Sequence, residues 1–157
     1  MAGKVDARLH DLKIQLPKPS APVANYLPYV VVGNLVFVSG QIPMGFNGIE
    51  FDGKIGADLS VEEGRKAARL CGLNLIAQLR EACSGDLDRV TRVVKLGGFV
   101  NCTEVFSQQP QVINGASDLM VEIFGDAGRH ARSAVGVADL PMNVSVEIDG
   151  IFEIRPV

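Results

Sequence analysis

Hydrophobic and polar residues alternate with a period of two along residues 129–149. Valines and small residues alternate up to Val137, Leu140-Pro141 interrupts the pattern, and the alternation returns from Val144 onward. Such alternation on both sides of a proline-containing break is typical of two strands joined by a short connection. The pattern therefore predicts a hairpin-like pair of strands, which we take as the stretch around which the chain is organised.

A second pair of strands is predicted near the start of the compact part. The runs 29–32 and 35–38 are rich in β-branched and aromatic residues and flank Gly33-Asn34. Glycine and asparagine accept the positive φ of a two-residue hairpin turn, so a hairpin is expected here. The second run leads into Ser39-Gly40-Gln41, where a glycine allows another part of the chain to approach the backbone closely.

Two helices are predicted between the strands. Ser60 and Glu63 have the spacing of a capping box, and apolar residues follow at steps of four. The second helix is expected to begin at Pro110 and to end at Gly125. A strand is expected over 90–100, in which Gly97-Gly98 indicates a bulge or a close neighbour, and residues 44–59 are predicted as a loop with at most one short strand.

Residues 1–25 are predicted to form an appendage to a domain over 26–157. Apolar residues recur at near-helical spacing up to Leu16, and the proline-rich stretch 17–22 cannot continue a helix. The order from residue 26 on is strand, strand, helix, strand, helix, strand, strand. Helices segregated against a mixed sheet make an α+β domain.

Composition narrows the functional classes. The chain of 157 residues has a net charge of −3 and no cluster of basic residues, which argues against a nucleic-acid binder. No apolar run reaches membrane-spanning length, so we expect a cytoplasmic protein that is neither membrane-spanning nor exported. Cys71, Cys83 and Cys102 fit no zinc motif, and we expect reduced thiols with no metal or cofactor.

Two charges within the opening stretch are candidates for chemistry. Arg132 lies at the start of the first strand, and Glu147 lies within the second among apolar residues. A guanidinium suits a carboxylate, and a half-buried glutamate suits proton transfer. Alternatively, both are ordinary strand-edge charges, or they pair with each other.

At this point a set of short motifs resembles the RidA/YjgF family of enamine and imine deaminases, once labelled L-PSP endoribonucleases. The resemblance covers about residues 26–155, and the N-terminal extension is similar to a longer branch of the family. It rests on Tyr29 before the Gly-Asn turn, SGQIP at 39–43, Asn114, ARS at 131–133, LP at 140–141 and VEI at 146–148.

The resemblance implies a chorismate-mutase-like fold, in which a mixed six-stranded sheet carries two helices on one face. It also implies a homotrimer with clefts between neighbouring subunits. In those clefts Arg132 would hold a substrate carboxylate and Glu147 would position or activate water. The other implied substrate-binding residues are Tyr29, Ser39, Gly40, Asn114, Ser133 and Ala134.

The sequence departs from the family at Ala134, where well-studied members have a cysteine. A contact made through the backbone would survive this change, whereas a role for the thiol would not. His130 replaces part of the usual proline-containing approach, and it is either a surface residue, the favoured interpretation, or a group at the cleft mouth.

Three functions follow from the resemblance. The first is hydrolysis of reactive 2-imino acids to 2-oxo acids and ammonia. The second is a non-catalytic trimer that binds a small carboxylate, such as an imino or oxo acid, and has a regulatory role. The third, an endoribonuclease, is disfavoured by the acidic charge balance.

Overall fold

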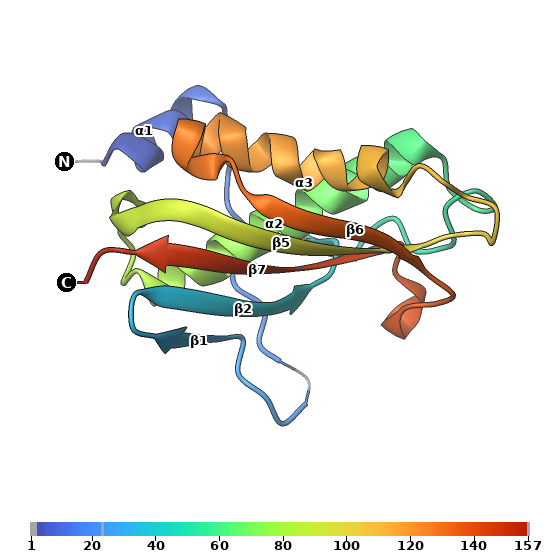
Figure 1. Cartoon of the computed structure of the whole chain (residues 1–157), viewed down its shortest axis with the longest axis horizontal. Helices are drawn as coiled ribbons and strands as arrows, with labels where there is room; N and C mark the ends of the chain where they lie inside the picture. Colours follow the sequence, from blue (N-terminus) through green and yellow to red (C-terminus); the bar gives the residue numbers. More distant parts are fainter. Residues whose placement is uncertain (1–2, 23, 157) are drawn as a thin grey trace.

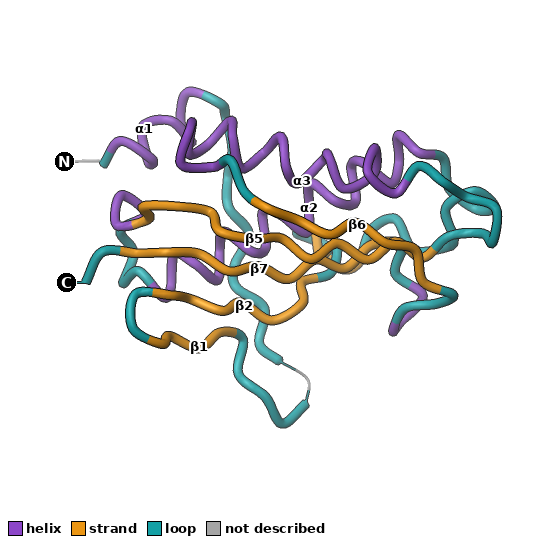
Figure 2. Tube along the Cα trace, viewed as in Figure 1, coloured by secondary structure: helices purple, strands orange, loops and turns teal. Residues whose placement is uncertain are grey.

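The computed structural model describes residues 3–22 and 24–156, which form a five-stranded sheet with helices packed on one face (Figures 1 and 2). Among these residues, no helix combines the length and the apolar character that a bilayer crossing requires. The helices are α1 (Lys4–Asp11), α2 (Val61–Ala82) and α3 (Gln109–Phe124), with short 3-10 turns η1 (Leu87–Arg89), η2 (Gly125–Gly128) and η3 (Pro141–Asn143). The strands are β1 (Tyr29–Val32), β2 (Leu35–Gln41), β3 (Met44–Gly45), β4 (Gly48–Ile49), β5 (Val90–Asn101), β6 (Ala131–Val137) and β7 (Val146–Ile154).

The sheet order β1-β2-β7-β5-β6 places the last strand of the chain at its centre. β7 is antiparallel to both of its neighbours, β2 and β5, while β5 and β6 run parallel. A parallel pair needs a crossover, and α3 supplies it. These pairings confirm a mixed sheet in an α+β domain, with α2 and α3 on one face.

The hairpin predicted for residues 129–149 is wrong, although both strands exist. β5 lies between β6 and β7 and pairs with each of them, so the two strands do not touch as neighbours. The segment that contains η3 carries the chain past the end of β5. Alternation of residues reports which strands form, whereas strand order depends on the long-range competition for partners, here won by the 12-residue β5.

The predicted sheet of six strands is also corrected, because the main sheet has five. The stretch 44–49 forms a separate small hairpin, in which Met44 pairs with Ile49 and Gly45 with Gly48. Strands of two residues expose too little backbone to extend the neighbouring sheet. The loop predicted for 44–59 therefore contains two short strands instead of one.

Local turn and cap chemistry places the predicted elements as expected. The Gly33-Asn34 turn joins β1 and β2, and Gly33 has φ of 60°. Ser60 and Glu63 make both hydrogen bonds of the capping box at the start of α2. Pro110 lies in the first turn of α3, and Gly125 caps its end with φ of 62°.

The core lies between the sheet and the two long helices. Alternate residues of β7 are buried toward α2 and α3, from Val146 to Ile154. Gly98 of β5 allows α3 to pack closely, because a Cβ at this position would lie 2.6 Å from the side chain of Ile113. The glycine pair predicted to form a bulge or a close approach makes the close approach, while the register shifts of β5 occur nearer its start.

The N-terminal residues pack on this domain at its α3 side (Figure 1). Leu9 of α1 is only 5% exposed and belongs to the core. The Asp88 carboxylate accepts hydrogen bonds from the backbone N–H groups of Lys4 and Val5 at 2.8 Å each. These bonds satisfy free donors at the start of α1.

Candidate functional site

Arg132 lies on the edge strand β6 with its guanidinium turned toward α3. Its Nη1 donates to the Asn114 Oδ1 at 2.8 Å and to the Ser117 Oγ at 3.0 Å. Its Nη2 donates to the Pro110 carbonyl at 3.4 Å. Three neutral acceptors from one helix therefore fix the orientation of this cation.

His130 extends the same network. Its Nδ1 lies 2.6 Å from the Gly128 carbonyl, which can only accept, and its Nε2 lies 2.9 Å from the Ser117 Oγ. Burial, assisted by the neighbouring Arg132 charge, lowers the pKa of His130 despite the opposing bond to Gly128. The neutral imidazole thus donates a hydrogen bond from Nδ1 and accepts one from the Ser117 hydroxyl at Nε2. The favoured prediction of a simple surface histidine is wrong, because His130 is half-buried and bonded at both nitrogens.

No carboxylate forms an ion pair with Arg132 within residues 3–22 and 24–156. Four other arginines do have such partners: Arg65, Arg69, Arg80 and Arg129. A half-buried guanidinium whose hydrogen bonds go only to neutral acceptors keeps its charge available. This arrangement suits an incoming anion.

Glu147 lies in β7 and points to the sheet face opposite the helices. Its neighbours Val146 and Ile148 are both fully buried toward the helices, whereas Glu147 is half-buried. Gly40 makes room for it, because a Cβ there would lie 2.7 Å from the carboxylate. The glycine predicted to allow a close approach in the Ser39-Gly40-Gln41 motif is therefore the one that accommodates the candidate acid.

The environment of Glu147 disfavours its charged form. Burial, followed by repulsion from Asp149 two residues along the strand, raises the pKa of the Glu147 carboxyl. No described side chain or backbone group donates a hydrogen bond to this carboxylate. A carboxyl group of this kind can exchange protons nearer to neutral pH than an exposed one.

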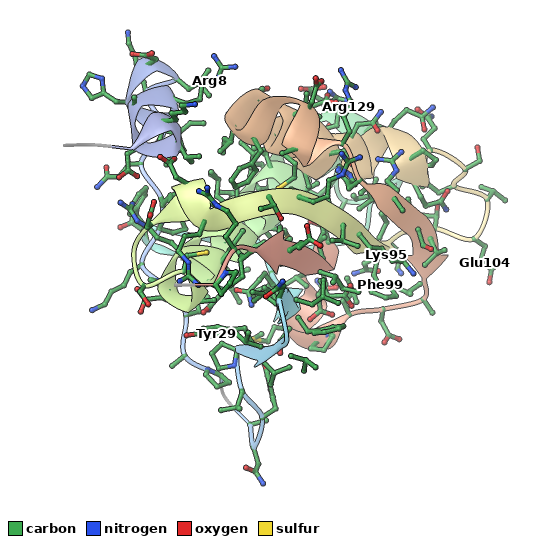
Figure 3. All side chains as sticks on the ribbon, turned by 60° about the vertical axis from the view of Figure 1, so that its left-hand side comes forward. Arg8, Tyr29, Lys95, Phe99, Glu104 and Arg129 are labelled. Carbon is green, nitrogen blue, oxygen red and sulfur yellow. The ribbon has the colours of Figure 1, made fainter. Side chains whose placement is uncertain are left out.

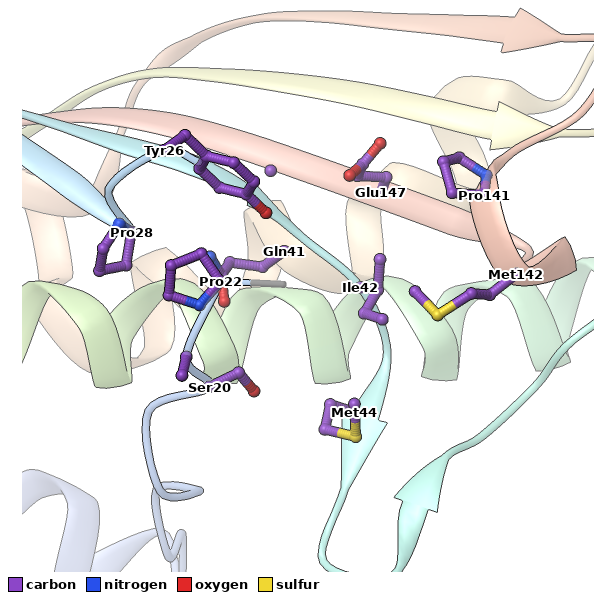
Figure 4. A pocket seen from close by; sticks show the side chains of 12 residues that line it. Ser20, Pro22, Tyr26, Pro28, Gln41, Ile42, Met44, Pro141, Met142 and Glu147 are labelled. Atoms are coloured by element: carbon purple, nitrogen blue, oxygen red, sulfur yellow. The ribbon is translucent and has the colours of Figure 1, made fainter. Parts of the chain in front are cut away.

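A cavity of about 290 Å³ opens beside Glu147 (Figure 4). Its walls come from the N-terminal segment, from the end of β2 and the residues after it, and from η3. The lining residues besides Glu147 are Ser20, Ala21, Pro22, Tyr26, Pro28, Gly40, Gln41, Ile42, Met44, Pro141 and Met142. Figure 4 shows Tyr26, Met142 and Glu147 around the same space. Most of the lining is apolar.

The other predicted site residues lie near the Arg132 network, near the cavity beside Glu147, or on the surface of the sheet. The Ser39 Oγ donates to the Leu27 carbonyl at 2.7 Å, which ties the cavity wall to β2. Tyr29 is half-buried against the core at the β1 edge, and Tyr26, not Tyr29, lines the cavity. Figure 3 shows Tyr29 at the opposite edge of the sheet from Arg129, which is next to the Arg132 network. Ala134 lies on the half-buried side of β6, whereas Ser133 is exposed.

Within one chain, Arg132 and Glu147 belong to different places. They occupy opposite faces of the sheet, and β5 separates their strands. The alternative that the two charges pair with each other is therefore wrong for a single chain. Nor is Glu147 an edge charge, because β7 is the central strand.

Sequence reasoning missed three residues at these places. Ser117 joins Arg132 to His130, while Tyr26 and Met142 line the cavity. The spacing of Asn114 and Ser117, three residues apart on one helix, was a usable signal once a helix was predicted there. Tyr26 and Met142 carried no such signal, because their positions depend on the path of loops.

Comparisons with known proteins agree with this fold. The model of the YjgF/chorismate mutase-like family, which also carries an endoribonuclease label, matches residues 6–152. Protein TCP17 of Trypanosoma cruzi is 49% identical, over 98% of this chain and 96% of its own length. The 2-iminobutanoate/2-iminopropanoate deaminase of Dermatophagoides farinae is 32% identical, over 90% of this chain and 95% of its own length.

A solved structure matches nearly the whole chain. The crystal structure of an Agrobacterium tumefaciens protein of unknown function has a TM-score of 0.90 and 47% identity. The match covers 96% of this chain and 92% of that one, so it includes the N-terminal segment as well as the sheet and helices. On the matched length and these similarities, the chain belongs to the RidA/YjgF family.

Proposed function

We propose that this protein hydrolyses 2-imino acids, and their enamine tautomers, to 2-oxo acids and ammonia. Water adds to the imine carbon, forming a carbon–oxygen bond and leaving an amino group on the same carbon. A proton then moves from the new hydroxyl to the nitrogen, the carbon–nitrogen bond breaks, and ammonia leaves. The reaction proceeds slowly in water, so orientation and proton transfer are the main tasks of the protein.

The observation that carries this proposal is the Arg132 guanidinium without a carboxylate partner. Every 2-imino acid has a carboxylate next to the reacting carbon, and a guanidinium binds that group in a fixed orientation. Asn114, Ser117 and Pro110 hold the guanidinium in place before substrate arrives. The conformational entropy of the Arg132 side chain is thus lost on folding and not on substrate binding.

Glu147 is assigned the proton transfers. Its raised pKa and its lack of a hydrogen-bond donor leave the carboxylate free to orient water, accept a proton from it and return the proton to nitrogen. No thiol is needed for these steps. Ala134 in place of the family cysteine is therefore compatible with the proposed chemistry.

A complete site of this kind needs more than one copy of the chain. Arg132 and Glu147 lie on opposite faces of the sheet, so an assembly that brings one copy's β6 edge against another copy's open face would unite them. That open face carries apolar side chains, including Phe37 at 37% exposed and Val135 at 45% exposed. These features support the homotrimer with clefts between subunits that the family resemblance implies.

A competition assay tests the proposal. An amino-acid oxidase generates the imine, semicarbazide traps it, and a deaminase suppresses the trapped product. We expect suppression by the wild type and a loss of kcat/KM of about 10- to 150-fold in Arg132→Ala, from the roughly 1.5–3 kcal/mol of a charged hydrogen bond. Full activity in that variant would contradict the proposal.

Arg129→Ala is the matched control. This arginine lies near the same network but is 68% exposed and pairs with Asp126 at 3.4 Å. Its loss should leave the rate unchanged. Binding of 2-oxo acids that depends on Arg132 but comes with no turnover would support the second candidate, a carboxylate-binding regulator.

A further inference from the structure

The cavity beside Glu147 is apolar and larger than the reaction itself requires. Its volume is about 290 Å³, whereas a 2-imino acid presents only a carboxylate and a C=N group to the catalytic residues. Among its described lining residues, Glu147 alone is charged. The cavity therefore offers no cation for a carboxylate, and its single negative charge disfavours an anionic group. An uncharged, apolar group fits it best.

One wall of the cavity is held in an unusual backbone conformation. Met142 has φ of 59° and Asn143 has φ of 57°, the left-handed region that residues other than glycine rarely adopt. Surrounding bonds maintain the turn, because the Asn143 carbonyl accepts from the Gly53 N–H at 2.7 Å and its N–H donates to the Leu140 carbonyl at 3.0 Å. Strained residues of this kind concentrate at ligand sites. Here the strain places a flexible apolar side chain at the cavity.

The opposite wall is formed by Ser20, Ala21, Pro22, Tyr26 and Pro28, and hydrogen bonds anchor it at Ser20 and at Pro28. The Gln78 Nε2 of α2 donates to the Ser20 carbonyl at 2.8 Å, and the Ser39 N–H donates to the Pro28 carbonyl at 2.9 Å. Prolines in this segment reduce its freedom further. A wall that is ordered in advance binds a ligand without an ordering cost.

From these observations we propose that the cavity binds the side chain of the substrate and selects 2-imino acids with large apolar side chains. Leucine, methionine and phenylalanine would give such imines. Met142 and Tyr26 form the walls that determine this specificity. The inference rests on the proposed function for the assignment of Glu147, and it adds the class of substrate.

The test compares kcat/KM across imines generated from alanine, leucine, methionine, phenylalanine and aspartate. We expect the three large apolar imines to exceed the alanine imine by about 10-fold or more, since each methylene in an apolar pocket contributes roughly 10- to 200-fold. The aspartate imine should be the poorest substrate because Glu147 repels its side chain. A preference for the alanine imine would overturn the proposal.

Two variants separate the side chain from the backbone. Met142→Gly and Asn143→Gly both relieve a positive φ, but only the first removes a wall of the cavity. We expect Met142→Gly to lose most of the preference for large apolar imines, measured as the ratio of their kcat/KM to that of the alanine imine. Asn143→Gly should keep the wild-type profile. Identical profiles for the two variants would overturn the assignment of Met142.

Binding distinguishes failure of this inference from failure of the proposed function. If no imine is hydrolysed, the proposed function fails. Calorimetric titration with 4-methyl-2-oxopentanoate and 2-oxopropanoate then tests the cavity, because the two acids share the carboxylate and differ only in their side chains. Tighter binding of the larger acid by the wild type, lost in Met142→Gly, would support the apolar pocket. Equal binding of the two acids would overturn it.

Discussion

The surroundings of Arg132 and of Glu147 are built in opposite ways. Arg132 donates three hydrogen bonds to α3, and the histidine behind it is also bonded at both nitrogens. Glu147 accepts no hydrogen bond from any described residue, and it lies between Gly40 and an apolar cavity. Arg132 is charged and held in one orientation, whereas the surroundings of Glu147 destabilise its charged form.

The difference corresponds to the two tasks in the proposed reaction. A group that binds a carboxylate must keep its charge and orientation before the ligand arrives. A group that moves protons needs an accessible pKa and free lone pairs, which strong hydrogen bonds would remove. The two environments lie on opposite faces of one sheet, so the division of tasks is also a division in space.

The largest expected effect is on activity, when a variant without Arg132 is co-expressed with a variant without Glu147. Tested alone, Arg132→Ala should lower activity about 10- to 150-fold, and Glu147→Gln should lower it about 10²-fold or more. If each site takes Arg132 from one subunit and Glu147 from another, random co-assembly leaves about a quarter of the sites intact. Co-expression of the two variants should therefore restore about that fraction of wild-type activity in the imine assay.

The control is a double variant that carries both substitutions in one chain and is co-expressed with wild type. The activity that comes from sites made only of wild-type subunits is subtracted from the activity of this mixture. No restoration in the mixture of single variants would show that both residues act within one chain. That result would contradict the separation of the two groups between subunits.

A smaller effect is expected when the support of Arg132 is reduced. Ser117→Ala removes one of the two acceptors of the Arg132 Nη1 and the partner of His130, while Asn114 remains. We expect KM for the imine to rise about 3- to 10-fold with little change in kcat, because one of several hydrogen bonds to a charged group is lost. Steady-state kinetics measures this separation.

Ser107→Ala is the control for that variant, since Ser107 is exposed in the loop before α3. Its KM should equal that of the wild type. A fall in kcat without a change in KM for Ser117→Ala would contradict a positioning role, because it would place Ser117 in the chemical step.

Local signals predicted most of the fold, because turns and caps depend on residues close in sequence. The Gly33-Asn34 turn, the Ser60 capping box and the Gly125 helix end are all where the sequence predicts them. The hairpin predicted for residues 129–149 was wrong because strand pairing, unlike turns and caps, does not depend only on residues close in sequence. The alternation of side chains specifies that strands form, but the partner of each strand is decided by the rest of the chain.

The candidate site shows the same limit. The family resemblance predicted Asn114 as a helix residue at the substrate cleft, and in the structure its Oδ1 accepts a hydrogen bond from Arg132. Sequence could not reveal that Arg132 and Glu147 lie on opposite faces, because strand order and register decide the face. Nor could it reveal the role of the proline-rich segment as a cavity wall, since that depends on contacts with Gln78 and Ser39, which are distant in sequence.

The smallest expected effect is on the free energy of unfolding. It tests whether the Glu147 carboxylate lacks a hydrogen-bond donor in the assembled protein, as it does in the single chain. Because its folded pKa is raised, the native state holds this proton more tightly than the unfolded chain, so the carboxyl lowers stability as pH rises above its ordinary value near 4.5. Glu147→Gln should therefore be more stable than wild type at pH 7, by less than about 1 kcal/mol because the group is half exposed. The gain should vanish in acid, where the wild-type carboxyl is protonated, and urea denaturation at fixed protein concentration measures both differences.

Asp118→Asn, which breaks an exposed ion pair with Arg65 at 3.5 Å, should show no such gain. A Glu147→Gln protein that is less stable at pH 7 would mean that a donor from a second copy bonds the carboxylate, and the contrast with Arg132 would then hold only for the isolated chain.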